Sequence, residues 1–403
     1  MISTKTSNMT SGKTFFVTTP PFYALYLAIF FFSLAFALPL YINSSFLATF
    51  VHGKLIGFLY AAEAAFSFLL LLQLPRILQK MGNWRATLLL VALLGLALLG
   101  LAYFETALLI IPVFIATQAL GSLIFFNFDV FFEAFSKDRE TGEIRGIMLT
   151  VVNVAILLGP LTTGIILSDG DYFKVFLVAA ALLVPVFLIF VARLKKFEDP
   201  DYKKIPYLQT LKKILFATHP NDEIRHAVLA SLFMRFFFSW MVIYMPLYLH
   251  TNLGFDWKEI GIMFTVMLLP FVLFEAPLGK IVDARGNEKK VLVTGFLITA
   301  FFTALLPFIA THTVVLWALL LFGTRVGVSF VEIASESYFF KHINAQDTDV
   351  LSLFINTRPV AYLAGSASAS ILLFMVSLQY LFLVLALLML LGAWNAGMMK
   401  ETA

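Results

Sequence analysis

The chain lacks cysteine and is poor in charge. Its 403 residues include no cysteine, and 13% of them are Asp, Glu, Lys or Arg, about half the share expected of a soluble domain. Without cysteine there is no disulfide framework, no thiolate nucleophile and no thiolate metal ligand. The histidines are scattered without the spacing of a metal site, and no G-x-x-x-x-G-K-[ST] loop is present to bind ATP. We therefore expect no metal, no cofactor and no ATP-driven activity.

Long apolar runs take the place of charge. Hydrophobic residues make up 61% of the chain, and the mean hydropathy is +0.92. Runs of about 20 apolar residues are typical of transmembrane helices, because the hydrocarbon core of a bilayer is about 30 Å thick. The first run has no small-residue cleavage site, so we expect it to be retained. We predict twelve spans, at 22–43, 55–74, 86–104, 107–134, 146–167, 172–192, 226–249, 258–277, 291–311, 314–340, 350–374 and 378–398.

The spans form two groups of six around one polar segment. We therefore predict an all-α polytopic membrane protein with a bundle at 22–192 and a second at 226–399. Residues 1–21 and 400–403 are tails. The segment 193–225 contains YLQTLKKILF, which predicts a linker with a short amphipathic helix on the membrane surface.

Lysine and arginine concentrate on one side of the predicted membrane. The tails, the linker and the loops after the second, fourth, eighth and tenth spans carry most of them, whereas the other side has Lys54, Lys174 and Lys258. The positive-inside rule therefore puts the linker and both termini in the cytoplasm. We expect the protein to be a monomer in the lipid bilayer. We expect that bilayer to be a cell membrane, namely the inner membrane of a bacterium. The net charge of +4 then needs no nucleic acid partner.

Parts of the first half recur in the second. LPRILQKMGNWR (74–85) aligns with LGKIVDARGNEK (278–289), and GKLIGF (53–58) aligns with WKEIGI (257–262), both at an offset of 204 residues. NVAILLG (153–159) resembles PVAYLAG (359–365) at an offset of 206 residues. These matches predict a duplicated six-helix unit, with both copies in the same orientation.

These features resemble the major facilitator superfamily, which has two sets of six helices, a cytoplasmic linker, and a loop of the form G-x-x-x-D-x-x-G-x-x-K/R. The first-half loop departs from this form, with Pro75 and Gln79 in place of the glycine and the aspartate. The second-half loop matches it with Gly279, Asp283, Gly286, Lys289 and Lys290, and has Arg285 inside it.

A second resemblance lies in the fifth span. Its GPLTTG segment, with Gly159, Pro160 and Gly164, is similar to the helix 5 motif of the family's proton-driven antiporters. The family's arginine motif in the fourth helix is missing, and Gln118 lies near its place. The likeness to the family covers nearly the whole chain, whereas the likeness to one branch is confined to short motifs.

The resemblance implies a secondary transporter that works by alternating access and is not an enzyme. In the family, the first, fourth, seventh and tenth helices line the central cavity. Each corresponding span here carries polar residues at spacings that place them on one helix face. They are Tyr26 and Ser33, then Gln118 and Ser122, then Ser231, Arg235 and Ser239, and finally Arg325, Ser329 and Glu332.

Charges near the membrane centre are expensive and are therefore functional candidates. Arg235 and Arg325 lie near the middle of their spans, where two guanidiniums suit a carboxylate or a phosphate. The alternative is that protein acids neutralise both arginines and fix helix packing.

Glu63 and Arg358 lie at similar depths in spans that meet in the family. We predict a contact between them that couples transport to protons, and a static ion pair is the alternative. Asp129 and Glu133, nearer the cytoplasm, are further candidates for coupling.

The substrate stays open between two hypotheses. The helix 5 motif and the aromatic content favour export of amphipathic compounds by a proton antiporter, whereas the two arginines favour an organic anion or a phosphorylated metabolite. Sodium is the alternative to the proton. A membrane-embedded transferase and a sensor with a transporter fold are the rival classes. In any of the transport hypotheses, the second-half loop motif is interpreted as a conformational latch.

Overall fold

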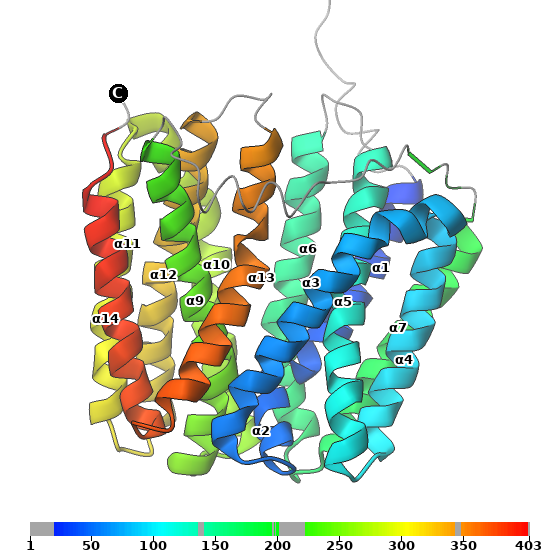
Figure 1. Cartoon of the computed structure of the whole chain (residues 1–403), viewed down its shortest axis with the longest axis horizontal. Helices are drawn as coiled ribbons and strands as arrows, with labels where there is room; N and C mark the ends of the chain where they lie inside the picture. The colour runs from blue at the N-terminus through cyan, green and yellow to red at the C-terminus, as the bar shows by residue number, and fades with distance from the viewer. Residues whose placement is uncertain are drawn as a thin grey trace, which may run out of the picture.

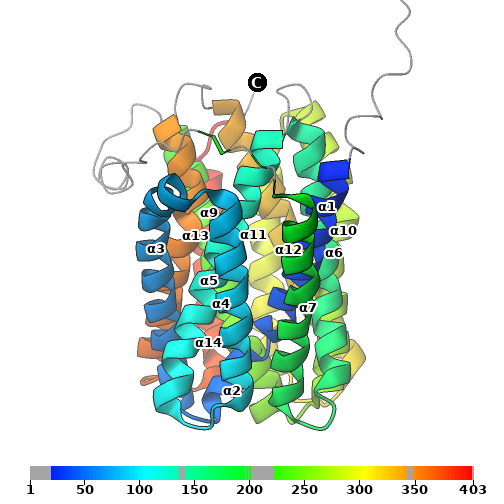
Figure 2. The same cartoon turned by 90° about the vertical axis from the view of Figure 1, so that its right-hand side faces the viewer.

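Twelve long helices make up most of the part of the chain that the structure describes (Figures 1 and 2). The structure is a computed structural model, and it describes residues 20–135, 141–195, 197, 199–200, 222–342 and 348–401. The first half contains α1 (Pro20–Leu40), α3 (Ile56–Met81), α4 (Asn83–Tyr103), α5 (Ala107–Phe135), α6 (Thr141–Ile166) and α7 (Tyr172–Arg193). The second half contains α9 (Asp222–Leu247), α10 (Trp257–Arg285), α11 (Glu288–Leu305), α12 (Val314–His342), α13 (Thr348–Leu372) and α14 (Leu378–Gly397).

Each predicted span coincides with one of these helices, so the predicted all-α membrane fold is confirmed. Four short elements complete the described chain: α2 (Asn43–Ala48), η1 (Gly53–Leu55), η2 (Tyr248–Asn252) and η3 (Leu306–Phe308). Within the described residues, eleven helices are long and apolar enough to cross a membrane, and α13 contributes a shorter apolar stretch, Pro359–Leu372. Large apolar side chains such as Leu96, Leu108 and Leu387 lie exposed on the helix surfaces, as expected where the solvent is lipid.

Two helices, α3 and α10, extend furthest beyond the spans predicted for them. The sequence predicts spans that end near residues 74 and 277, but α3 continues to Met81 and α10 to Arg285. Each of these helices ends at a glycine with positive φ, which is 77° at Gly82 and 58° at Gly286. The predicted polar loops are therefore mostly helical, because the charged residues before each glycine are compatible with a helix and glycine supplies the left-handed turn that ends it.

The two halves meet along two pairs of helices, α3 with α13 and α6 with α10. In the first pair, a Cβ added to Gly57 would lie 2.2 Å from the carbonyl oxygen of Ser366. In the second pair, a Cβ added to Gly261 would lie 2.5 Å from the carbonyl oxygen of Pro160. Only glycine permits backbones to approach so closely.

These two contacts are related by the duplication. Gly57 and Gly261 are 204 residues apart, and Pro160 and Ser366 are 206 residues apart, which are the offsets that relate the two halves in the sequence. The second half therefore repeats the first in its contacts as well as in its helix order, and each half gives one glycine to the other.

Both contacts lie at the same end of the molecule. Gly57 follows the start of α3 and Gly261 follows the start of α10, and these starts lie opposite the end where α7 finishes and α9 begins. We call the latter the linker side, and it is at the top of Figure 1. In that view α3 and α13 converge at the bottom and are far apart at the top.

Candidate transport site

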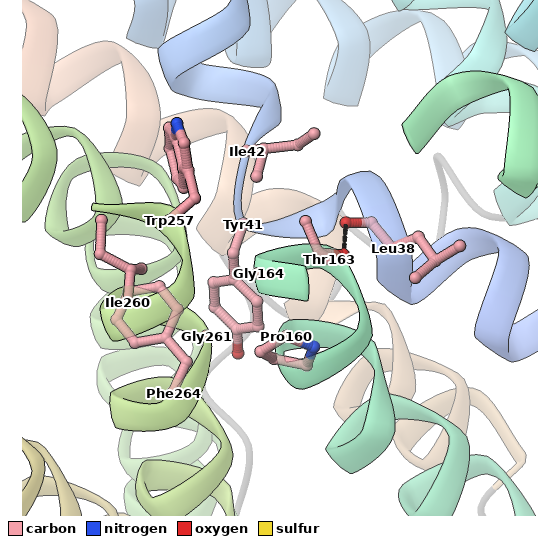
Figure 3. Close-up of a pocket in the computed structure, with 10 residues that line it drawn as sticks. All are labelled: Leu38, Tyr41, Ile42, Pro160, Thr163, Gly164, Trp257, Ile260, Gly261 and Phe264. Atoms are coloured by element: carbon pink, nitrogen blue, oxygen red, sulfur yellow. Dashed lines mark hydrogen bonds between the residues drawn. The ribbon is translucent and has the colours of Figure 1, made fainter. Parts of the chain in front are cut away.

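The end opposite the linker side is closed by aromatic and backbone contacts between the halves. The Tyr41 ring of the first half lies 4.8 Å from the Phe264 ring of the second, and Tyr172 lies 6.0 Å from Trp257. Figure 3 shows Tyr41 between α6 and α10, close to Gly261. The pocket that these residues line is about the volume that one water molecule needs, so the two halves are closely packed at this contact.

The helix 5 motif belongs to this closed end. A Cβ on Gly164 would lie 2.6 Å from the carbonyl oxygen of Trp257, and a Cβ on Gly159 would lie 2.7 Å from the Cβ of Ala37 on α1. Thr163, within the same segment, donates a hydrogen bond to the carbonyl oxygen of Leu38 at 2.7 Å (Figure 3). The motif therefore packs α6 against α1 and α10.

Arg325 on α12 is buried near the middle of its helix. Its side chain is 0% exposed, and its Nε and Nη1 atoms have no hydrogen-bond partner among the described residues. The guanidinium carbon lies 5.4 Å from the centre of the Phe237 ring and 4.9 Å from that of Phe238. Cation–π contacts of this kind offset part of the desolvation of a charge, but they leave its N–H donors unused.

Three polar side chains act electrostatically on Arg325. They are Tyr41, just beyond α1, Tyr362 on α13 and Glu332 on α12. Glu332 was predicted from the sequence, whereas the two tyrosines were not. Tyr41 lies near the end of the first predicted span, 22–43, away from the stripe of Tyr26 and Ser33. Tyr362 lies four residues from Arg358 and from Ser366, a spacing that would have placed it on a polar face of its helix. Ser329, on the same helix as Arg325, is buried, and its hydroxyl donates to the carbonyl oxygen of Val326.

Arg235 on α9 differs from Arg325 because it has protein partners. Its Nε atom donates to the Ser231 hydroxyl at 3.2 Å, and its charge interacts with that of Glu336 on α12. Ser239, on the same face of α9, is buried against Gly365, and its hydroxyl has no partner among the described residues. The predicted α9 stripe therefore lies within the second half, against α12 and α13.

Two of the polar side chains predicted on α1 and α5, Tyr26 and Ser122, donate hydrogen bonds to backbone carbonyl oxygens. Tyr26 stacks on Phe132 and donates to the carbonyl oxygen of Ile144 at 3.4 Å, and the Ser122 hydroxyl donates to the carbonyl oxygen of Gln118. Ser33 and Gln118 are both buried. The Ser33 hydroxyl has no partner in the described part of the chain.

Glu63 is half-buried on α3, the helix that packs on α13. It accepts a hydrogen bond from Ser67 at 3.0 Å and acts electrostatically on Tyr60. The side chain of Arg358 lies outside the described residues, so the contact predicted between it and Glu63 stays a prediction. Asp129 and Glu133 are exposed near the linker side, where Asp129 interacts with the charges of Glu133 and Arg145.

The second-half gating motif lies at the linker side, at the end of α10 and the start of α11. Gly279 is half-buried, and a Cβ there would meet Ile333 of α12 at an ordinary 3.9 Å. Lys289 is half-buried, and Lys290 forms an exposed ion pair with Glu401 at 3.3 Å. The side chains of Asp283 and Arg285 lie outside the described residues, so the latch stays a prediction.

Sequence patterns missed a polar network beside the first-half turn. The backbone N–H of Asn83 donates to the Asp199 carboxylate of the linker at 2.6 Å. The Asn83 side chain donates to the carbonyl oxygen of Asn127 on α5, whose own amide donates to Thr87 at 2.9 Å. Asp199 lies 116 residues from Asn83, and no local pattern connects residues that far apart.

The comparisons with known proteins agree with this architecture. The family model described as Major Facilitator Superfamily matches residues 227–400. A crystal structure of the nucleoside transporter NupG shares 12% identity and a TM-score of 0.74, covering 94% of this chain and 98% of that one. A mutant of NupG gives 13% identity, a TM-score of 0.74, and coverage of 93% and 98%. No curated protein sequence matches the chain. The second half therefore matches the Major Facilitator Superfamily model, and almost the whole chain shares the fold of a solved nucleoside transporter.

Proposed function

We propose that this protein is a secondary transporter, a carrier and not an enzyme, that moves a small organic anion by alternating access. The observation that supports it is the symmetric pair of glycine contacts, Gly57 with Ser366 and Gly261 with Pro160, at one end of the molecule. Two equivalent close contacts on either side of the central region let the halves rock about it as rigid bodies. Arg325 lies buried within the part of the second half that this motion would uncover.

The orientation of the chain is part of the proposal. Lysine and arginine concentrate on the linker side, which therefore faces the cytoplasm, and the membrane is the inner membrane of a bacterium. In that orientation the described conformation is closed toward the outside. The bundles at 22–192 and 226–399 are the rocking units, and the segment 193–225 connects them.

The coupling ion in this proposal is the proton, and Glu63 binds it. A half-buried carboxyl group on α3, the helix that packs on α13, changes its surroundings if these helices separate during transport, and its affinity for a proton changes with them. Ser67 and Tyr60 provide the polar neighbours of Glu63 in the described state. The static alternative is a permanent ion pair between Glu63 and Arg358.

A second candidate function is export of amphipathic compounds. The Phe237 and Phe238 rings beside Arg325 support it, because aromatic side chains contact apolar ligands of many shapes. The helix 5 motif supports it less, since close helix packing already accounts for Gly159 and Gly164.

Flux measurements in proteoliposomes test the proposal. Labelled organic anions and cations are offered with an imposed pH gradient, and we expect accumulation of anions only. Glu63→Gln should reduce gradient-driven accumulation to the level of protein-free liposomes and leave gradient-free exchange intact, because a side chain that binds no proton can still allow rocking. Glu105→Gln, at an exposed position, is the control. Gradient-driven accumulation that is intact in Glu63→Gln would remove Glu63 from coupling, and a response to cations alone would favour the second candidate.

A further inference from the structure

We propose that Arg325 is the anchor for the substrate, and that the substrate is a small monocarboxylate with an apolar body. This inference rests on the proposed transport of an organic anion. It goes beyond that proposal because it names the arginine that binds the substrate, and because it gives the substrate a single negative charge and an apolar remainder. In this inference Arg235 does not contact the substrate.

The unused donors of Arg325 support an anionic ligand. A guanidinium grips a carboxylate through one of two edges, Nε with Nη2 or Nη1 with Nη2. Because Nε and Nη1 have no hydrogen-bond partner among the described residues, each edge carries an unused donor. A side chain that is 0% exposed cannot satisfy these donors with bulk water, and a buried charge without hydrogen bonds is strongly unfavourable. A carboxylate would supply both the charge and the acceptors.

Arg235 provides the contrast within the same half. Its Nε atom is already hydrogen-bonded to the Ser231 hydroxyl, and its charge interacts with that of Glu336. We therefore assign the two arginines different roles, although the sequence predicts both as candidates for substrate binding. Arg235 holds α9 to α12, and Arg325 is available to a ligand.

The surroundings of Arg325 limit what the ligand is. Phe237 and Phe238 form apolar walls within 5.4 Å and 4.9 Å of the guanidinium, so the body of the ligand beyond its carboxylate is apolar. Glu332 acts on the same guanidinium, and its acid repels a second negative charge. A phosphorylated metabolite, with two charges and a polar body, fits these surroundings less well than a monocarboxylate does.

The position of Tyr41 connects this site to the transport cycle. Tyr41 belongs to the first half, packs on Phe264 of the second half, and acts electrostatically on Arg325. When the halves separate at the closed end, Tyr41 moves away from α10 and the Arg325 site opens to that side. The site therefore changes its exposure with the motion that carries the solute.

Ligand binding to the purified full-length protein in detergent tests the inference. The probes are benzoate, phenylacetate and 4-methylpentanoate, each paired with its uncharged amide, and calorimetry gives the affinity. We expect at least one carboxylate to bind saturably and its amide not to bind. Arg325→Gln should weaken binding about ten- to hundredfold, as expected for the loss of a hydrogen bond to a charged group, and Arg235→Gln by less than about threefold.

One further variant keeps the outcome decisive. Arg325→Lys retains the charge in case Arg325→Gln does not fold, and it should still weaken binding because an ammonium lacks the planar fork. Equal affinity in wild type and Arg325→Lys, equal binding of amide and acid, or no saturable binding of any probe would overturn the inference. Because binding is measured without a gradient, an inactive flux assay with intact binding counts against the proposed transport function and leaves the anchor in place.

Discussion

The two turns on the linker side, one in each half, begin alike and are completed differently. Gly82 ends α3 and Gly286 ends α10, 204 residues later, and asparagine follows each glycine. Both glycines have positive φ, 77° and 58°. The turn itself is therefore a property of the duplicated unit.

What stabilises the helix after each turn is different. In the second half, Glu288 lies in the first turn of α11, is fully buried, and pairs with Lys341 of α12. Position 84 of the first half, the counterpart of 288, holds a tryptophan, whose indole donates to the carbonyl oxygen of Phe190 on α7 at 2.9 Å. The first half thus has no acid of its own at this position.

The linker supplies the missing acid. Asp199 accepts a hydrogen bond from the backbone N–H of Asn83 at 2.6 Å, where a carboxylate also complements the helix dipole of α4. Phe197, two residues earlier, packs on Phe131 of α5 with ring centres 4.4 Å apart. The first half therefore holds the start of the linker, whereas the second half completes its turn internally.

The largest effect on stability is expected when the glycine of each turn is replaced by alanine. At Gly82, with φ 77° and ψ 157°, the backbone is in a region that only glycine adopts readily, and a Cβ would lie 2.4 Å from the Asp199 carboxylate. We expect Gly82→Ala to lower the free energy of unfolding by about 2–3 kcal/mol, and Gly286→Ala by about 1 kcal/mol because its left-handed helical conformation costs other residues less. Thermal unfolding in detergent, followed by tryptophan fluorescence, measures both. Equal losses would mean that the two turns are equivalent.

A smaller effect is expected at the linker carboxylate. Asp199→Ala removes the acceptor for the Asn83 N–H, and loss of a helix cap lowers stability by about 1 kcal/mol. Because the linker then loses its attachment to α4, trypsin should cleave it faster after Lys195. Asp169→Ala, an exposed acid on the opposite side, is the control for a general charge effect. Unchanged proteolysis of Asp199→Ala would show that Phe197 alone holds the linker.

The smallest effect is expected at the exposed pair beside the second turn. Lys290 and Glu401 lie 3.3 Å apart, with side chains 71% and 59% exposed, and pairs of this kind contribute about 0–1 kcal/mol. We expect Lys290→Gln to leave the unfolding midpoint within about 1 °C of the wild type, a shift that corresponds to only a few tenths of a kcal/mol. A loss as large as that of Asp199→Ala would mean that the C-terminal segment contributes to the second turn as the linker contributes to the first.

Patterns of neighbouring residues in the sequence predicted the helices and the duplication of the six-helix unit. Hydropathy located all twelve helices, because a helix in lipid satisfies its own backbone and needs only apolar side chains. The repeat offsets of 204 and 206 residues predicted two equivalent halves, and Gly57 and Gly261 occupy equivalent contacts. The helix ends of α3 and α10 were less well predicted, since charged residues near an interface fit a helix as well as a loop.

The site was predicted only in part. Spacing on one helix face selected Arg235, Arg325 and Glu332, because polar residues that recur on one face of an apolar helix are visible in the sequence. It gave no means to distinguish the arginines, since whether Ser231 or an aromatic ring lies against a guanidinium depends on side-chain rotamers and on the neighbouring helix.

The sequence by itself determined that this chain forms a membrane protein of two repeated six-helix halves. The length of each apolar run, the glycines at the turns and the repeat offsets can all be read from the order of the residues. The tertiary structure alone decided which end is closed, which arginine has N–H donors without a hydrogen-bond partner among the described residues, and that Asp199 completes the first turn. Each of these depends on contacts between segments far apart in the chain, such as Tyr41 with Phe264 and Asn83 with Asp199. Such contacts arise from the packing of whole helices, and no local rule of spacing or composition specifies them.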